Sequence, residues 1–413
     1  MTTDGLVLVV GSGIRAYREY LLASAAQRRP VWLLDAVEPT WQHDYAQGAT
    51  VVELLDPKRL LPDQDLLVKT AVDLAAEHRI EGVFTYDETL VVTTAHIAEA
   101  LGLRGLGVSG AEHCRNKQYT RERLTAAGIL QPRFSYVTTD ADARAAADEF
   151  GYPVVFKPRG MGASIGVVFV GGPGEVADAF AMSDLSSHGG NPLYQGGVLV
   201  EEYLTGPEIS VDGATFDGEY RPFFVGRKRL GPEPYFEEVG HVVSADDPLL
   251  TDPGLVDMLA AAHRALGIRD GVTHTEVKLT DRGPAIVEVN GRLGGDLIPY
   301  LGRLATGIDP AHVAVDIATG VRPTLEPTLR RSVGIRFSYP EHDGRVLGVT
   351  LPAARPGLLE AAAMVQPGAE LRLPPEGYLS RYAYVICAAD TAEGCEAALD
   401  AASAGTAVTL EAL

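Results

Sequence analysis

A pair of short apolar segments around one turn imposes the strongest constraint on how this chain folds. Residues 272–279 and 285–289 each have the composition of a β-strand, and Asp281-Arg282-Gly283-Pro284 between them is typical of a turn. We therefore expect a β-hairpin, in which side chains two positions apart point to the same face. Any fold for this chain has to accommodate that hairpin and the polar residues on it.

The polar residues of this hairpin form a candidate metal site. Glu288 and Asn290 share one face, and the hairpin can place Glu276 beside them. Two carboxylates and an amide oxygen suit Mg²⁺ held jointly by protein and phosphate oxygens, and Arg292 can grip a phosphoryl oxygen. A solvated hairpin edge is the alternative interpretation. The metal site is favoured because the residues between these oxygens are apolar and are expected to be buried.

Composition narrows the class of protein. The chain has 413 residues, enough for two or three domains, with 35 basic and 55 acidic residues and a formal charge of −20. This charge argues against nucleic acid or an anionic membrane as a partner. No apolar run is long enough for a membrane span, and the first residues do not form a basic leader. The three cysteines lack metal or redox spacing, so we expect reduced thiols and a cytoplasmic protein.

The first hundred residues alternate between strand and helix patterns. Leu6 to Val10 is an apolar run, a helical pattern covers residues 16–28, and Val31 to Asp35 is apolar again. This order indicates an open parallel sheet for residues 1 to about 112.

The turn after the first strand resembles a dinucleotide-binding fingerprint. Residues 11–16, Gly-Ser-Gly-Ile-Arg-Ala, fit the loose G-x-G-x-x-A form, and Asp35 ends the next strand. Any tight strand-to-helix turn selects glycine, however, and Arg15 and Tyr17 stand where the helix should approach a pyrophosphate. An NAD(P)-dependent oxidoreductase is therefore a disfavoured alternative.

Two lysines and a loop of small residues form a candidate polyphosphate site. Residues 154–158 read as a strand that ends with Lys157, and the loop of residues 159–166 follows. Small residues let backbone N–H groups approach phosphates, while an adjacent ammonium offsets their charge. Lys157 precedes the glycines, which excludes the P-loop fold. Lys117, at the start of a predicted helix, offers a second cation. The alternative is a flexible hairpin with lysines at the surface.

A strand that ends in paired acids follows. In residues 198–204, Val-Leu-Val-Glu-Glu-Tyr-Leu, apolar positions give way to Glu201 and Glu202, and Glu208 comes after a Thr-Gly-Pro turn. Such a strand end can present backbone groups to an adenine edge, and Glu208 can accept hydrogen bonds from ribose hydroxyls. A plain strand, turn and strand is the structural alternative.

Taken together, these motifs resemble the ATP-grasp superfamily, over about residues 1 to 330. The resemblance implies an α/β and α+β fold with an open parallel-sheet N-terminal domain, an ATP-grasp core of two α+β subdomains and a small C-terminal α+β lid. It also implies that a carboxylate is activated by ATP as an acyl phosphate and is then attacked by an amine. Such phosphoryl transfer needs positioning and charge neutralisation and no nucleophile from the protein.

The resemblance also implies a role for each matching residue. ATP is expected to contact Lys117, Lys157, Gly162, Ser164, Glu201, Glu202, Tyr203, Leu204 and Glu208. Two Mg²⁺ ions, with Mn²⁺ as a substitute, are expected on Glu276, Glu288 and Asn290. Arg292 is expected to be catalytic, because it can stabilise the transferring phosphoryl group and the acyl phosphate.

Further residues resemble the branch of the superfamily that joins two unprotected amino acids. Glu238 stands three residues before His241, and Gly295 and Asp296 follow Arg292. The resemblance implies that these residues contact the substrates, with Asp296 as a candidate partner for a substrate ammonium. His241 can assist deprotonation of the attacking amine, because its charge changes near neutral pH. A surface loop around Glu238 and His241 is the alternative. The basic run 227–229 is expected to be a solvated strand end, with a substrate contact from one of its residues as the alternative.

We therefore expect an ATP-dependent carboxylate–amine ligase that forms a dipeptide or a related amide and works as a homodimer. The expected domains are residues 1–112, 113–325 and 326–413, with subdomains of about 113–197 and 198–325 in the middle domain. The alternatives are an ATP-grasp carboxylase, a ligase with a non-amino-acid substrate and a non-catalytic nucleotide-binding regulator. An intact Arg292 and a full set of metal ligands weigh against the regulator.

Overall fold

The N-terminal region forms an open parallel sheet. The computed structural model describes residues 5–56, 61–189, 192–231, 236–374 and 376–413. The sheet has the order β3-β2-β1-β6, and all of its strand pairs are parallel, as the sequence predicts. Its elements are β1 (Leu6–Val10), α1 (Arg15–Arg28), β2 (Val31–Asp35), β3 (Gly48–Val51), α2 (Gln64–Glu77), β6 (Ile80–Phe84) and α3 (Val91–Ala100). A small ribbon of β4 (Leu54–Asp56) and β5 (Leu61–Pro62) lies between β3 and α2 in the chain.

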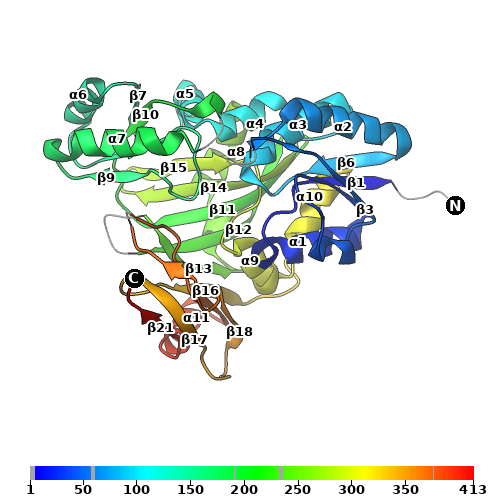
Figure 1. The fold of residues 1–413 in the computed structure, drawn as a ribbon. Coiled ribbons are helices and arrows are strands. Elements are labelled where there is room, and N and C mark those ends of the chain that lie inside the picture. Colours follow the sequence, from blue (N-terminus) through cyan, green and yellow to red (C-terminus); the bar gives the residue numbers. More distant parts are fainter. Residues whose placement is uncertain (1–4, 57–60, 190–191, 232–235, 375) are drawn as a thin grey trace.

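A second sheet of four strands follows, and two helices pack against it. Its order is β7-β10-β8-β9, with antiparallel pairing throughout. Figure 1 shows helices α6 and α7 beside the strands of this sheet at the upper left. Its elements are β7 (Phe134–Val137), α6 (Asp140–Phe150), β8 (Val154–Lys157), β9 (Val168–Val170), α7 (Val176–Ser187) and β10 (Val198–Glu202). Strand β10 belongs to this sheet because it pairs with β7 and β8.

The centre of the molecule is one antiparallel sheet of eight strands. Its order is β15-β14-β11-β12-β13-β16-β20-β18, and it occupies the middle of Figure 1. The strands are β11 (Glu208–Phe216), β12 (Glu219–Leu230), β13 (Glu238–Ser244), β14 (Gly271–Thr280), β15 (Gly283–Asn290), β16 (Ser332–Ser338), β18 (Leu358–Ala363) and β20 (Ala383–Ala389). The expected hairpin is confirmed as β14 and β15, although both strands run further than the pattern indicated and leave a turn of only Asp281 and Arg282.

The surface-loop alternative for Glu238 and His241 is wrong. Both residues lie on β13, which pairs with β12 on one side and β16 on the other. The sequence pattern was misleading because this strand carries ionisable residues near its start, where they face partners from other elements.

Helices and a small three-stranded sheet complete the fold. The remaining α-helices are α4 (Val108–Arg115), α5 (Lys117–Ala126), α8 (Pro253–Leu266), α9 (Ile298–Thr306), α10 (Pro310–Ala318) and α11 (Ala392–Ser403). Strands β17 (Gly344–Thr350), β19 (Glu370–Leu371) and β21 (Ala407–Glu411) form the three-stranded sheet, near the C-terminus at the bottom of Figure 1. None of the helices in the described ranges is long and apolar enough to cross a membrane.

A buried arginine links the β7-β10-β8-β9 sheet to the eight-stranded sheet. Arg121 on α5 is 1% exposed and donates to both carboxylate oxygens of Glu201 on β10, at 2.7 and 3.1 Å. It also donates to the backbone carbonyl of Val287 on β15, at 2.6 Å. Burial of a charge is tolerated only when it is paired and hydrogen-bonded. Arg121 therefore fixes how two separate sheets meet.

Replacement of Arg121 by Met should destabilise the fold strongly. The variant would leave the buried Glu201 carboxylate with one cation fewer, and loss of one partner of such a pair costs about 3–5 kcal/mol. Urea unfolding of the wild type and Arg121→Met measures this loss. Arg123→Met is the matched control, because Arg123 is exposed on the same helix and its loss should change stability by less than about 0.5 kcal/mol. Equal stability of wild type and Arg121→Met would contradict the structural role.

Candidate active site

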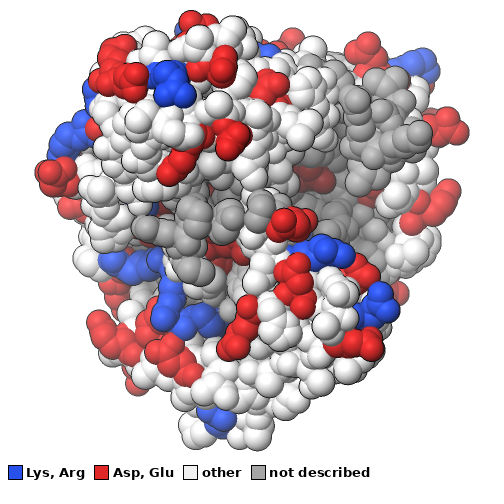
Figure 2. All heavy atoms as spheres, turned by 60° about the vertical axis from the view of Figure 1, so that its left-hand side comes forward, with Lys and Arg blue, Asp and Glu red and all other residues white. Residues whose placement is uncertain are grey.

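The two antiparallel sheets enclose a cleft that gathers most of the predicted site. It has a volume of about 260 Å³. The predicted residues that line it are Lys117, Lys157, Gly162, Ser164, Glu201, Glu202, Tyr203, Leu204, Glu208, Glu238, Glu276, Glu288, Asn290, Arg292, Gly295 and Asp296. His241 does not line it. Figure 2 shows acidic and basic side chains interspersed over the face that it draws, which fits a ligand recognised inside a cleft and not on a basic surface.

The two predicted lysines converge at one part of this cleft. The side chain of Asn116 caps helix α5 by accepting from the backbone N–H of Gln118, so Lys117 stands in the first turn. Its ammonium donates to the carbonyl of Met161 in the small-residue loop at 2.5 Å. Lys157, at the end of β8, pairs with Glu201 at 2.7 Å. Burial lowers the pKa of Lys157, and the nearby charges of Arg121 and Lys117 lower it further. An anion placed between the two lysines would offset this excess of positive charge.

Strand register places the two acids of the hairpin directly opposite each other. Glu276 on β14 and Glu288 on β15 are cross-strand partners. Burial raises the pKa of Glu276, and the Glu288 charge adds to this effect. Burial would also raise the pKa of Glu288, but Lys117 at 3.0 Å, together with Lys157, outweighs it and lowers this pKa to about 2. Glu288 is thus ionised at any physiological pH.

The Asn290 amide lies beside these acids, as the sequence predicts. Its terminal atoms are 3.0 Å from the Glu288 carboxylate and 3.2 Å from that of Glu88. One orientation of the amide donates hydrogen bonds to both acids, and the other adds its own oxygen to theirs. The oxygens of Glu276, Glu288 and Asn290 therefore fit a hard divalent cation by their chemistry.

Lys228 is a central residue of the cleft that sequence reasoning did not single out. Its side chain is 1% exposed and its ammonium lies 2.9 Å from Glu208, 2.6 Å from Glu238 and 3.2 Å from Glu276. Burial would lower the pKa of Lys228, but the three carboxylates raise it well above its usual value. Strand periodicity was the available signal, because it turns Lys228 to the opposite face from its neighbours in the basic run.

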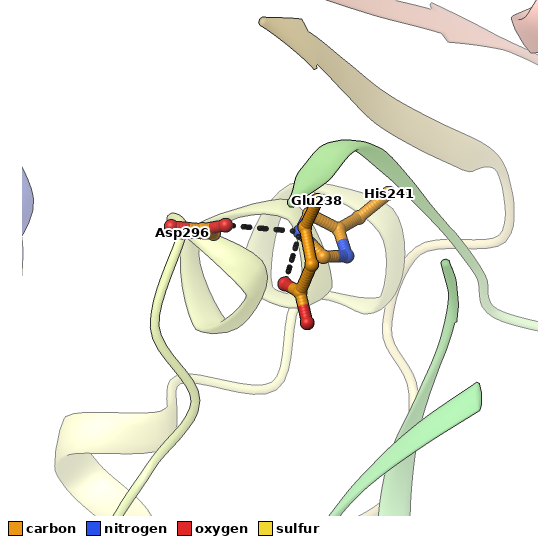
Figure 3. A group of neighbouring side chains, drawn as sticks. All are labelled: Glu238, His241 and Asp296. Carbon is orange, nitrogen blue, oxygen red and sulfur yellow. Dashed lines mark hydrogen bonds and ion pairs between the residues drawn. The ribbon is translucent and has the colours of Figure 1, made fainter. Parts of the chain in front are cut away.

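Glu238, His241 and Asp296 form a compact group beside the cleft. Figure 3 shows the imidazole of His241 between the two carboxylates, with its Nε2 atom 3.2 Å from Glu238 and 3.3 Å from Asp296. Three such side chains can also hold a metal ion. Lys228 and Arg381 already neutralise these two acids, however, so the group has no surplus negative charge for a second cation.

The surroundings of His241 do not favour its predicted role as a catalytic base. Burial would lower the pKa of His241, but its hydrogen bonds to Asp296 and Glu238 raise this pKa to about 9. The imidazole is therefore already protonated at neutral pH and is fully buried. It cannot accept a proton from an attacking amine in this state. Its geometry is that of a buried cation that fixes the two carboxylates.

Arg381 reaches the cleft from the C-terminal part of the chain, and no local sequence pattern marks it as a site residue. It pairs with both oxygens of Asp296, at 2.6 and 2.7 Å, and donates to the hydroxyl of Tyr339 at 2.8 Å. Since Asp296 is held by Arg381 and His241, a substrate ammonium would have to share it. Asp296 also has a positive φ of 51°, a left-handed conformation that costs energy and needs such outside contacts.

Glu88 is a second residue from a distant segment that contacts a cleft residue. It belongs to the short helical turn Glu88–Leu90 in the N-terminal region, and its carboxylate lies 2.7 Å from Arg292 and 3.2 Å from Arg115. Arg292 is thus neutralised by an acid about two hundred residues away. No spacing rule in the sequence links the two residues.

Comparisons with known proteins agree with this geometry. Residues 150–299 match the family described as ATP-grasp domain, residues 34–105 match the ATP-grasp N-terminal domain, and residues 336–411 match the L-amino acid ligase C-terminal domain 2. The crystal structure of an L-amino acid ligase from Bacillus licheniformis superposes with a TM-score of 0.80 and 22% identity, covering 100% of both chains.

Two curated relatives are similar in sequence. Alanine–anticapsin ligase of Bacillus subtilis is 29% identical over 274 residues, which are 62% of this chain and 57% of that protein. An uncharacterised protein of Sinorhizobium fredii is 29% identical over 336 residues, covering 79% of this chain and 67% of that protein. The match thus spans a little over half the length of the first relative.

The charged state of His241 predicts a pH-dependent stability. A group whose pKa is raised on folding, here from 6.5 to about 9, stabilises the fold fully below pH 6.5 and loses this effect as pH rises through 9. The advantage of wild type over His241→Gln in unfolding free energy should therefore shrink by on the order of 3 kcal/mol between pH 6.5 and 9.5. Urea unfolding across this range measures it, with exposed His188→Gln as the control. A difference that does not change with pH would contradict the assignment.

Proposed function

Because this chain belongs to the ATP-grasp superfamily of carboxylate–amine ligases, we propose that it activates an amino acid carboxylate with ATP and joins it to the amine of a second amino acid. The observation that carries this proposal is the single cleft that brings together two lysines, paired acids and an arginine from separate elements. The relatives named as L-amino acid ligase and alanine–anticapsin ligase support the choice of substrate class.

In this proposal the nucleotide lies between the two antiparallel sheets. Lys117 and Lys157 neutralise the phosphates, and the small-residue loop with Gly162 and Ser164 covers them. The end of β10, Glu201 to Leu204, faces the adenine, and Glu208 accepts from the ribose. The Glu201 carboxylate is already held by Arg121 and Lys157, so we assign its adenine contact to the backbone.

We assign the metal ions to Glu276, Glu288 and Asn290, whose oxygens fit Mg²⁺ or Mn²⁺. Two bound ions would offset the charge of the phosphates and align them for transfer. Lys117 and Lys228, which pair with Glu288 and Glu276 in this structure, would be free to turn toward the phosphates once cations neutralise these acids.

The protein's own residues then favour the reaction by position and charge. A carboxylate oxygen of the first amino acid attacks the terminal phosphorus of ATP, which releases ADP and forms an acyl phosphate. The amine nitrogen of the second amino acid attacks the acyl carbon, the amide bond forms, and phosphate and a proton leave. Arg292, next to the acid pair, is placed to offset charge on the phosphoryl oxygens.

We assign the substrate end of the cleft to Glu238, Gly295 and Asp296, which line it together with Arg292. We propose that Glu238 and Asp296 orient the substrates through a fixed charge network in which His241 is a positioning residue and not a base. Addition of a Cβ atom to Gly295 meets open space, which leaves room for a substrate beside this loop.

We also propose the division into domains of residues 1–112, 113–325 and 326–413, a homodimeric assembly and a cytoplasmic location. The three cysteines are unpaired and buried, which fits a reducing compartment. Light scattering measures the assembly directly.

Replacement of Glu288 by Gln should abolish turnover while the chain stays folded. The amide lacks the charge that a divalent cation requires, so phosphate release should fall by at least about a hundredfold. Phosphate release and circular dichroism measure the two effects. Asp281→Asn, in the exposed turn of the same hairpin, is the control and should retain activity. Phosphate release at the wild-type rate from Glu288→Gln would refute the metal assignment.

The proposed reaction is tested by phosphate release from Mg²⁺-ATP with amino acids supplied singly and in pairs, followed by mass spectrometry. We expect release that depends on two amino acids and a product with their summed mass less water. If ATP binds but no amino acid pair reacts, the dipeptide proposal fails, and other acids, other amines and bicarbonate become the substrates to examine.

A further inference from the structure

Arg18 is a partly buried cation that contacts a loop bordering the cleft and has no part in the proposed reaction. It lies on α1, and its guanidinium donates to the backbone carbonyl of Gly294 at 3.3 Å and stands 5.5 Å from the centre of the Tyr86 ring. Gly294 lies between Arg292 and the cleft-lining Gly295. The N-terminal helix therefore presents a positive charge to the loop that borders the substrate end.

The other arginines of α1 show what is unusual about Arg18. Arg15 pairs with Glu19 at 2.9 Å, and Arg28 pairs with Asp316 at 2.7 Å. Within the described ranges of the chain, no carboxylate lies within 4.0 Å of the Arg18 guanidinium. Burial lowers the pKa of Arg18, and the neighbouring charge of Arg292 lowers it further. The acid that neutralises Arg292, Glu88, does not pair with Arg18. An anionic ligand would supply the missing charge.

The glycine turn before α1 is shaped around this side chain. Gly13 has a φ of +67°, and a Cβ atom there would lie 2.9 Å from Cγ of Arg18. The turn is held in place because the backbone N–H of Ser12 donates to Asp35 at 2.8 Å and Gln42 donates to the Ser12 hydroxyl at 2.7 Å. The Gly-Ser-Gly sequence that resembles a dinucleotide fingerprint thus leaves space for the Arg18 side chain. The Asp35 carboxylate accepts a hydrogen bond from this turn.

The proposed reaction indicates which anionic group would bind to Arg18. The carboxylate of the first amino acid becomes the acyl phosphate, so it must lie near Lys117, Lys157 and the paired acids. The second amino acid keeps its own carboxylate throughout, and only its amine enters the reaction. That carboxylate needs a cation of its own, and Arg18 contacts Gly294, next to Gly295 and Asp296 in the lining of the cleft.

We propose that Arg18 binds the carboxylate of the attacking amino acid and so selects free amino acids over amines that lack a carboxylate. This inference rests on the proposed ligase activity and adds a residue from the N-terminal domain to its substrate site. An arginine suits this task because its planar guanidinium can donate two parallel hydrogen bonds to one carboxylate.

The test compares a reacting amino acid with its carboxamide as the attacking partner, in wild type and Arg18→Gln. Glutamine can still donate to the Gly294 carbonyl but has no charge. Loss of one charge-assisted contact should raise the KM for the amino acid roughly ten- to a hundredfold, leave the KM for its carboxamide unchanged and leave the KM for ATP unchanged. The preference for the free acid should therefore largely disappear. Arg15→Gln, on the exposed face of the same helix, should keep this preference.

A second variant covers the case in which Arg18→Gln does not fold. Gly13→Ala keeps Arg18 but crowds its Cγ atom, so it should weaken the same preference while the KM for ATP stays constant. The proposal is overturned if a folded variant keeps the wild-type preference for the amino acid over its carboxamide. It is also overturned if the KM for ATP or for the phosphorylated amino acid rises instead. A wild type that forms no amide with any amine refutes the proposed ligase activity, which is a separate outcome.

Discussion

Charge that is removed from water must be neutralised, and this requirement organises the cleft from end to end. Arg121 and Lys157 share the carboxylate of Glu201, and Lys117 pairs with Glu288. In both groups the partners come from different elements. The ion pairs therefore hold the four-stranded sheet against the eight-stranded sheet at the place where a ligand must enter. These carboxylates also hold the lysine side chains in fixed orientations, so an anion that binds the lysines would cost little further side-chain entropy.

Much of the site could be predicted because strand geometry is local. Alternation along β15 places Glu288 and Asn290 on one face, and the short turn brings Glu276 opposite Glu288. Such relations depend only on residues within about twenty positions. The same holds for Lys157, which follows an apolar strand directly and enters the cleft because that strand ends there.

The rest of the site depends on contacts between distant segments. Arg381 lines the cleft and Glu88 pairs with the cleft residue Arg292, and no neighbour in sequence marks either of them as functional. The charge of His241 could not be predicted either, since it depends on Asp296, which lies 55 residues further along the chain. Sequence identifies the titratable residue, whereas only the fold supplies the acids that decide its protonation. The same reasoning separates Arg18 from Arg15, because only the fold shows that Arg15 pairs with Glu19 whereas Arg18 pairs with no carboxylate of the described residues.

The eight-stranded sheet has a consequence for how such chains can be recombined. Strand β16 pairs with β13 in the register Gly240 to Arg336, so the residues beyond 326 enter the same sheet as the cleft residues. A Cβ atom on Gly240 would come within 2.7 Å of the Ile335 carbonyl, and this close approach demands a matching neighbour. A chimaera that takes its C-terminal domain from a relative would have to re-form hydrogen-bonded strand pairs within one sheet, in addition to the covalent join. Exchange of single side chains along the cleft is therefore a more accessible route to new specificity than exchange of whole segments.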